Sequence, residues 1–213
     1  MKVQSHHPYQ GLRALARPAA PGRGAEDGPE ANSRLTAMTA GALLVLFAVE
    51  GFTLLRLHSM LTVHVFVGTL LLPPALLKIG STGYRFARYY LGSPAYRRKG
   101  PPPPLLRVLG PVVVISTLGL LLSGVALMFI GIGLRPQVLF LHRATFIVWF
   151  AAMTVHVLGY ALETARLAPR DWARRAHRDV SGARLRQWAV AGSVAVGVPL
   201  GLLLMARTGN WYL

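Results

Sequence analysis

The residues of this chain best suited to chemistry are two histidines in one apolar segment, residues 141–159, LHRATFIVWFAAMTVHVLG. His142 and His156 are 14 positions apart, which at 3.6 residues per turn returns them to nearly the same helix face, about 21 Å apart along the axis. A polar ring at membrane depth is costly and marks function, and neutral imidazole is a standard axial ligand of haem iron. The spacing therefore predicts a helix that offers one or two iron ligands.

Two more histidines, His58 and His64, belong to an earlier apolar segment. They lie about 120° apart around a helix, so they cannot both face one cofactor. Counted from the expected starts of their helices, His64 and His142 each lie about five residues in and so at similar depth. Gly68, one turn below His64, would leave room for a porphyrin. We expect His64 and His142 to hold one iron, with the pair His58 and His142 as the alternative.

A second haem would need a partner for His156. The residue 14 positions after His64 is Lys78, whose amine ligates iron only when deprotonated, so we expect it to reach the headgroups or a haem propionate. Arg143 could meet a propionate or lie among the headgroups, and its spacing leaves both open. In the alternative interpretation the histidines form interhelical hydrogen bonds in a haem-free protein.

Composition indicates an integral membrane protein. The 213 residues are 53% hydrophobic and 14% charged, with a mean hydropathy of +0.45. The formal charge of +16 comes from 23 Lys and Arg against 7 Asp and Glu. These basic residues flank the apolar segments and no nucleic-acid motif is visible, so we expect membrane lipid and no nucleic acid as a partner. Because the chain has no cysteine, a disulfide, a thiolate-bound cluster and a covalently attached haem are excluded.

The elements that would position the histidines are five apolar segments, which predict an all-α polytopic membrane protein with five transmembrane helices. We expect a disordered cytoplasmic tail (1–33), a four-helix haem-binding core (34–165), a basic cytoplasmic loop (166–186) and a fifth transmembrane helix with a short outer tail (187–213). The second span is expected to end near residue 79 and to kink at Pro73 and Pro74. Residues 78–107 are expected to form a loop, with a short interfacial helix near residues 84–90.

The distribution of charge predicts the topology. Of the 23 Lys and Arg residues, 19 fall in the tail, at Arg34 directly after it, and in the second and fourth connections. The positive-inside rule therefore places the N terminus in the cytoplasm and the C terminus outside. We expect a multi-pass protein of a bacterial inner membrane.

Two hairpins of helices share short patterns. Glu50-Gly51 corresponds to Ser123-Gly124, and residues 62–65, TVHV, recur as residues 154–157. The two hairpins are either related copies or similar by coincidence in a Val-rich and Leu-rich chain. Glu50 is expected to pair with Arg56 at its own helix end.

These residues resemble bacterial membrane cytochromes b of the cytochrome b561 type, including the membrane subunits of formate dehydrogenases and hydrogenases. The resemblance covers roughly residues 41–163 and rests on His64 with Gly68 and on His142 with His156. It implies a helical bundle with one or two haems b, His142 and His64 on one iron, and His156 on another. It further implies exchange of electrons with quinone or quinol and with a partner oxidoreductase subunit. The chain departs from the family in having no histidine on its first span and Lys78 where the second helix could supply a ligand.

The sequence therefore predicts a b-type cytochrome that transfers electrons between the quinone pool and a partner oxidoreductase. It would be an electron-transfer subunit rather than a stand-alone enzyme, because the chain has no glycine-rich nucleotide motif. The alternative is a haem-free membrane anchor, an assembly subunit or a small transporter.

Overall fold

The protein is helical throughout the part that the computed structural model describes, residues 23–101, 103–172 and 180–211. Its elements are α1 (Arg23–Leu54), α2 (Leu57–Leu70), α3 (Leu72–Tyr90), α4 (Pro94–Lys99), α5 (Pro104–Leu127), α6 (Arg135–Leu167), η1 (Ala168–Trp172), α8 (Ala183–Met205) and η2 (Thr208–Trp211). Within these residues, 5 segments are long and apolar enough to cross a membrane: Gly28–Leu54, Leu57–Tyr90, Pro104–Leu127, Arg135–Trp172 and Ala183–Met205. The predicted all-α polytopic fold with five spans is confirmed.

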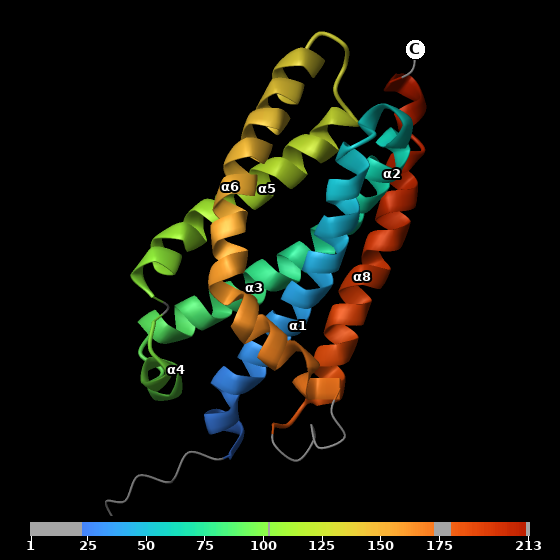
Figure 1. The fold of residues 1–213 in the computed structure, drawn as a ribbon. Coiled ribbons are helices and arrows are strands. Elements are labelled where there is room, and N and C mark those ends of the chain that lie inside the picture. The colour runs from blue at the N-terminus through green and yellow to red at the C-terminus, as the bar shows by residue number, and fades with distance from the viewer. Residues whose placement is uncertain (1–22, 102, 173–179, 212–213) are drawn as a thin grey trace, which may run out of the picture.

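The spans form a bundle with α1 near its middle (Figure 1). Helices α2 and α8 pack on one side of α1, and the antiparallel hairpin of α5 and α6 lies on the other. One apolar cluster, around Leu43, Leu71 and Leu121, joins α1, α3 and α5. A second, around Val65, Leu127 and Leu204, joins α2, α5 and α8, and Val138 and Leu139 of α6 pack against it. All four helices of the expected core are therefore held by apolar packing together with the fifth.

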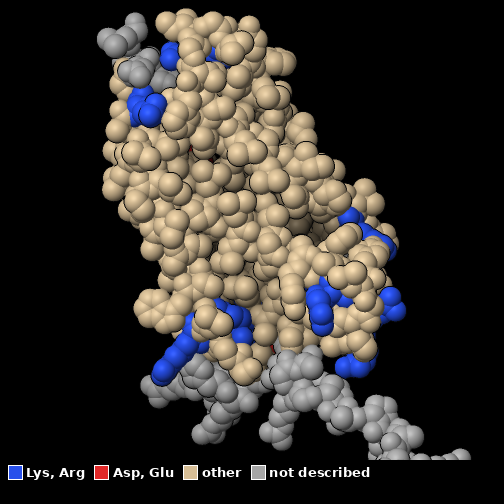
Figure 2. All heavy atoms as spheres, turned by 180° about the vertical axis from the view of Figure 1, so that it is seen from behind, with Lys and Arg blue, Asp and Glu red and all other residues tan. Residues whose placement is uncertain are grey.

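The two ends of the bundle differ in charge. We call the end that carries α4 and η1 the basic end, and the end with the α1–α2 and α5–α6 connections the opposite end. Figure 2 shows Lys and Arg side chains at the two ends, with a broad band of other residues between them. Such a band is what a bilayer requires, because charged side chains are costly at its centre.

The second span bends at its proline pair and then continues as a helix. Leu71 separates α2 from α3, yet its N–H donates to the Val67 carbonyl (3.0 Å) and its carbonyl accepts from the Ala75 N–H (2.9 Å). Pro73 and Pro74 stand in the first turn of α3, where a helix does not need their missing N–H groups. The predicted interruption is found here. The loop expected over residues 78–83 is wrong, because α3 runs to Tyr90 and includes the helix expected near residues 84–90.

Two other expected boundaries differ. Residues 23–33, expected in the disordered tail, form the beginning of α1, while residues 1–22 lie outside the described residues. There the Asn32 side chain donates to the Ser81 carbonyl (3.1 Å), which ties this part of α1 to α3. The fifth span begins at Ala183, inside the segment expected to be a basic loop. Of that segment, residues 168–172 form η1 and residues 173–179 lie outside the described part.

Helix α8 approaches α2 very closely through two glycines. A Cβ atom at Gly197 would lie 2.7 Å from the Leu70 carbonyl oxygen, and one at Gly201 would lie 2.7 Å from the Phe66 ring. This Gly-x-x-x-Gly spacing is the one that allows helix backbones to approach each other in membranes. Because Phe66 and Leu70 are roughly opposite His64 around α2, α8 supports the histidine-bearing helix from behind.

Candidate paired-histidine site

The structure brings His64 of α2 and His142 of α6 together. The centroids of the two imidazole rings are 6.5 Å apart and the ring planes are nearly perpendicular, at 85°. Both side chains are half-buried. The backbones of α2 and α6 are not among the closely packed helix pairs, so the rings reach toward each other across the space between these helices.

The first helix holds His64 in place. The Glu50 carboxylate oxygen Oε1 lies 2.9 Å from His64 Nδ1, and Thr53 Oγ1 lies 3.0 Å from the same nitrogen. The Thr53 hydroxyl donates its own hydrogen to the Glu50 backbone carbonyl (2.6 Å). It therefore accepts from His64, as the carboxylate does, which assigns the proton of this ring to Nδ1.

The third span holds His142 in the same manner. Ser123 Oγ lies 3.0 Å from His142 Nδ1, and the Ser123 hydroxyl donates to the Leu120 carbonyl (3.0 Å). The serine oxygen is therefore the acceptor, and the His142 proton is on Nδ1 as well. In both rings the nitrogen that keeps a lone pair is Nε2. A histidine that ligates a metal usually has its other ring N–H bonded to such an outer acceptor.

Two glycines make room for these contacts. A Cβ atom at Gly68 would lie 3.1 Å from Glu50 Oε1, and one at Gly124 would lie 3.2 Å from His142 Cε1. Gly68 was expected to leave space for a porphyrin. In the structure its missing side chain is next to the carboxylate that binds His64. The other Glu50 oxygen, Oε2, is buried and has no hydrogen-bond partner among the described residues.

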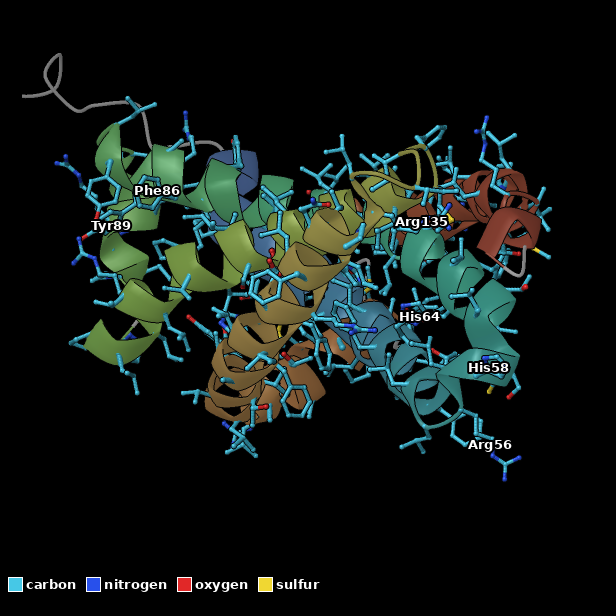
Figure 3. The ribbon with its side chains drawn as sticks, turned by 90° about the horizontal axis from the view of Figure 1, so that it is seen from above. Arg56, His58, His64, Phe86, Tyr89 and Arg135 are labelled. Atoms are coloured by element: carbon cyan, nitrogen blue, oxygen red, sulfur yellow. The ribbon has the colours of Figure 1, made fainter. Side chains whose placement is uncertain are left out.

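His58 and Arg143 are not brought into this site. His58 is exposed near the beginning of α2, and Figure 3 shows it apart from His64, toward the edge where Arg56 points away from the molecule. The structure therefore favours His64 over His58 as the partner of His142. Arg143 is exposed on α6. Arg56 is also exposed, and the expected pair of Glu50 with Arg56 is replaced by the contact of Glu50 with His64.

His156 lies deeper on α6, separated from the paired histidines by Trp149. Trp149 is buried, with 7% of its surface exposed; its indole N–H donates to Thr117 Oγ1 (3.0 Å), and its ring packs against Phe47 at 4.9 Å. His156 Nδ1 is buried without a hydrogen-bond partner among the described residues. Its ring packs against Tyr160, with the centroids 4.9 Å apart.

Lys78 is the residue that the sequence offers where a partner of His156 is expected. It lies near enough for its positive charge to act on the His156 ring. The Lys78 ammonium, however, donates to the backbone carbonyl of Thr36 on α1 (2.9 Å). This bond joins α3 to α1 and directs the Lys78 amine to the α1 backbone.

Sequence reasoning found both histidines but missed Thr53 and Ser123 and misplaced Glu50. For Ser123 and Glu50 the sequence does contain a signal, because the repeat matches Glu50-Gly51 with Ser123-Gly124. In the described residues no group of three or more His, Cys, Asp or Glu side chains could hold a metal ion. Comparison with protein-family models, curated proteins and solved structures gave no match.

Proposed function

We propose that the protein is a membrane cytochrome b in which His64 and His142 are the two axial ligands of one b-type haem. The observation that carries the proposal is the pair of neighbouring imidazoles whose Nδ1–H groups are both bonded to acceptors on adjacent helices, so that both Nε2 lone pairs remain for iron. A metal held by two opposed imidazoles at about 2.0–2.1 Å from each nitrogen separates the ring centroids by about 6–6.5 Å. The observed separation of 6.5 Å agrees with this value.

The donor set supports haem better than a bare metal ion. Two imidazoles alone leave most positions of a bare ion open, whereas a porphyrin supplies four nitrogens of its own and needs two axial ligands. Glu50 accepting from His64 would make that ligand more basic, and Ser123 orients His142 without adding charge. The haem would supply one-electron redox chemistry, and the protein would hold it in an apolar bundle that excludes water.

The surroundings of His156 support a protein with one haem rather than two. The position opposite it is Lys78, whose ammonium is bonded to the Thr36 carbonyl. The electron partners would be a quinol or quinone in the bilayer and a neighbouring oxidoreductase subunit. By the positive-inside rule, the basic end would face the cytoplasm of a bacterium and the C terminus would lie outside.

The test is the haem content of the purified protein. The wild type and the variants His64→Ala, His142→Ala, His156→Ala and His58→Ala are purified in detergent from haem-replete cells, and haem is measured as the pyridine haemochrome. We expect about one haem per chain, lost in His64→Ala and His142→Ala and kept in His156→Ala and the matched control His58→Ala. Near two haems, with one lost in His156→Ala, would replace the single-haem proposal by a two-haem one. A colourless wild-type protein would refute the cytochrome and support the haem-free anchor or transporter.

A further inference from the structure

The second half of α3, together with α4 and the first turns of α5, forms a corner that projects from the bundle at the basic end. Beyond Ser81, where Asn32 of α1 bonds to it, α3 continues to α4 at the side of the molecule (Figure 1). We call residues 84–107 of this corner the arginine–tyrosine shelf. It contains six basic residues and no acidic residue, and the basic residues are Arg85, Arg88, Arg97, Arg98, Lys99 and Arg107.

Neutral groups hold the arginines of the shelf. Arg88 donates to Ser93 Oγ (3.4 Å), and its guanidinium lies 5.9 Å from the centre of the Tyr96 ring. Arg107 bonds the Tyr90 hydroxyl and lies 5.8 Å from the centre of that ring. Neither arginine has a carboxylate within ion-pair distance among the described residues. Both are exposed, so their donors are only partly used.

The positive charges of the shelf act on one another. Burial lowers the pKa of Lys99, the positive charge of Arg85 lowers it further, and Glu30 and Glu163 raise it. Glu30 is already paired with Arg34 (3.2 Å) and Arg170 (3.3 Å). Neither Arg88 nor Arg107 is among the cations on which these acids are seen to act. An anion from outside the chain would relieve this repulsion.

Apolar side chains lie between the cations. Phe86 is 64% exposed, Leu91 82%, Leu105 67% and Val108 73%. In Figure 3, Phe86 and Tyr89 lie on the far side of the molecule from His64, on the projecting corner. Tyrosine rings and arginines together suit the boundary of a bilayer, where apolar groups meet acyl chains and guanidinium groups meet phosphates.

We propose that the arginine–tyrosine shelf binds the phosphate groups of anionic phospholipids in the leaflet at the basic end, with Arg88 and Arg107 as the principal donors. Charge complementarity selects this occupant, because the shelf is entirely basic and is joined to apolar side chains that an acyl chain can cover. Guanidinium groups bind phosphate through two parallel N–H donors, which ammonium groups cannot do. The positive-inside rule accounts for the cations in this connection. It does not account for the tyrosine rings that lie beside Arg88 and Arg107.

The experiment measures lipid binding by native mass spectrometry of the full chain in detergent with added phosphatidylglycerol or phosphatidylcholine. We compare the wild type with Arg88→Gln/Arg107→Gln and with Arg88→Lys/Arg107→Lys. The matched control, Arg56→Gln/Arg207→Gln, removes two exposed arginines at the opposite end. Helical content and melting temperature in phosphatidylcholine confirm that each variant is folded.

We expect the wild type to prefer phosphatidylglycerol and the glutamine variant to bind it about 25-fold more weakly, about fivefold for each arginine. The lysine variant should lose part of the affinity, because it keeps charge without the paired donors, and the control should retain all of it. Equal binding of both lipids by the wild type would overturn the proposal, as would an equal loss in the control. So would unchanged phosphatidylglycerol binding in the glutamine variant, which would leave the shelf open to an acidic protein instead.

Discussion

At the scale of single residues, the two histidines of the paired site have unequal partners. Glu50 presents a carboxylate to His64 at 2.9 Å, whereas Ser123 presents a neutral hydroxyl to His142 at 3.0 Å. A carboxylate partner makes an imidazole a stronger donor of electron density to a metal. It thereby favours ferric over ferrous iron. The two sides of the proposed haem should therefore respond differently to the loss of their partners.

The variant Glu50→Gln tests this difference. It keeps the size of the side chain and removes its charge, so we expect a higher midpoint potential and haem affinity reduced by about 10–100-fold. Spectroelectrochemical titration and haem-release kinetics measure the two effects. Ser123→Ala should weaken haem binding with a smaller change in potential. A potential that moves no further in Glu50→Gln than in Ser123→Ala would show that the carboxylate does not tune this ligand.

A second prediction concerns Gly68. In Gly68→Ala the new Cβ would lie 3.1 Å from Glu50 Oε1, so the carboxylate must move away from His64. We expect reduced haem occupancy and a shift of the potential in the same direction as in Glu50→Gln. Gly51→Ala is the matched control, because nothing lies within 4 Å of its Cβ position. If both alanine variants have wild-type spectra and potentials, Gly68 is not needed to place Glu50.

The sequence was sufficient to find the histidines but not their partners, for a physical reason. Helical periodicity fixes which residues of one helix share a face. The depth of each histidine, counted from the expected start of its helix, was enough to rank His64 with His142. The partner of Glu50 depends on how α1 turns relative to α2, which periodicity within one helix does not determine. The local candidate, Arg56, instead points into solvent (Figure 3).

At the scale of elements, the core consists of two helical hairpins, and each of them places one histidine of the paired site. In each, the first helix supplies a hydrogen-bond acceptor and the second supplies a histidine: Glu50 for His64 in α1 and α2, and Ser123 for His142 in α5 and α6. This arrangement matches Glu50 with Ser123, as the sequence repeat does, but it matches His64 with His142, whereas the TVHV pattern aligns His64 with His156. The second span was expected to end near residue 79 because hydropathy falls there. The helix nevertheless continues, since polar residues on one face are compatible with helical hydrogen bonding.

The contact of α8 with α2 gives a prediction for elements. Gly197→Ala and Gly201→Ala place a Cβ within 2.7 Å of Leu70 and Phe66, so the helices must separate. Overpacking of this kind costs about 1–3 kcal/mol, and we expect lower melting temperatures in detergent together with weaker haem retention. In the same helix, Gly192→Ala has nothing within 4 Å and should melt at or above the wild-type temperature. Equal melting temperatures for all three variants would mean that α8 does not press on α2.

At the scale of the whole molecule, one buried carboxylate ties the basic end together. Asp171 of η1 has a fully buried side chain (0% exposed), and Arg34 of α1 lies 3.2 Å from it. Arg186 of α8 donates to the same carboxylate (2.9 Å). Gln187 donates to the Asp171 backbone carbonyl (2.7 Å). The first span, the end of the fourth and the start of the fifth therefore meet at one ion cluster. Two of its three charged residues, Asp171 and Arg186, lie in sequence that is predicted to be a loop.

Removing that carboxylate should loosen the fifth span. In Asp171→Ala the buried Arg186 loses its carboxylate partner, while Arg34 keeps Glu30. The loss of one partner from a buried pair costs about 3–5 kcal/mol. We expect a strongly lowered melting temperature and faster proteolysis of the connection before α8, with Asp171→Asn intermediate because it retains hydrogen-bond acceptors. Glu30→Gln removes a partly exposed carboxylate that pairs with Arg34 and Arg170 but leaves Asp171 in place. It should therefore lower stability less than Asp171→Ala does. If haem content falls in parallel with the melting temperature in Asp171→Ala, then the Asp171 cluster stabilises the haem site, because it holds α8 and α8 packs on the helix that carries His64. If the protein melts early but keeps its haem, the four-helix core holds the paired histidines without its fifth helix, as the separate boundary at residues 34–165 predicted.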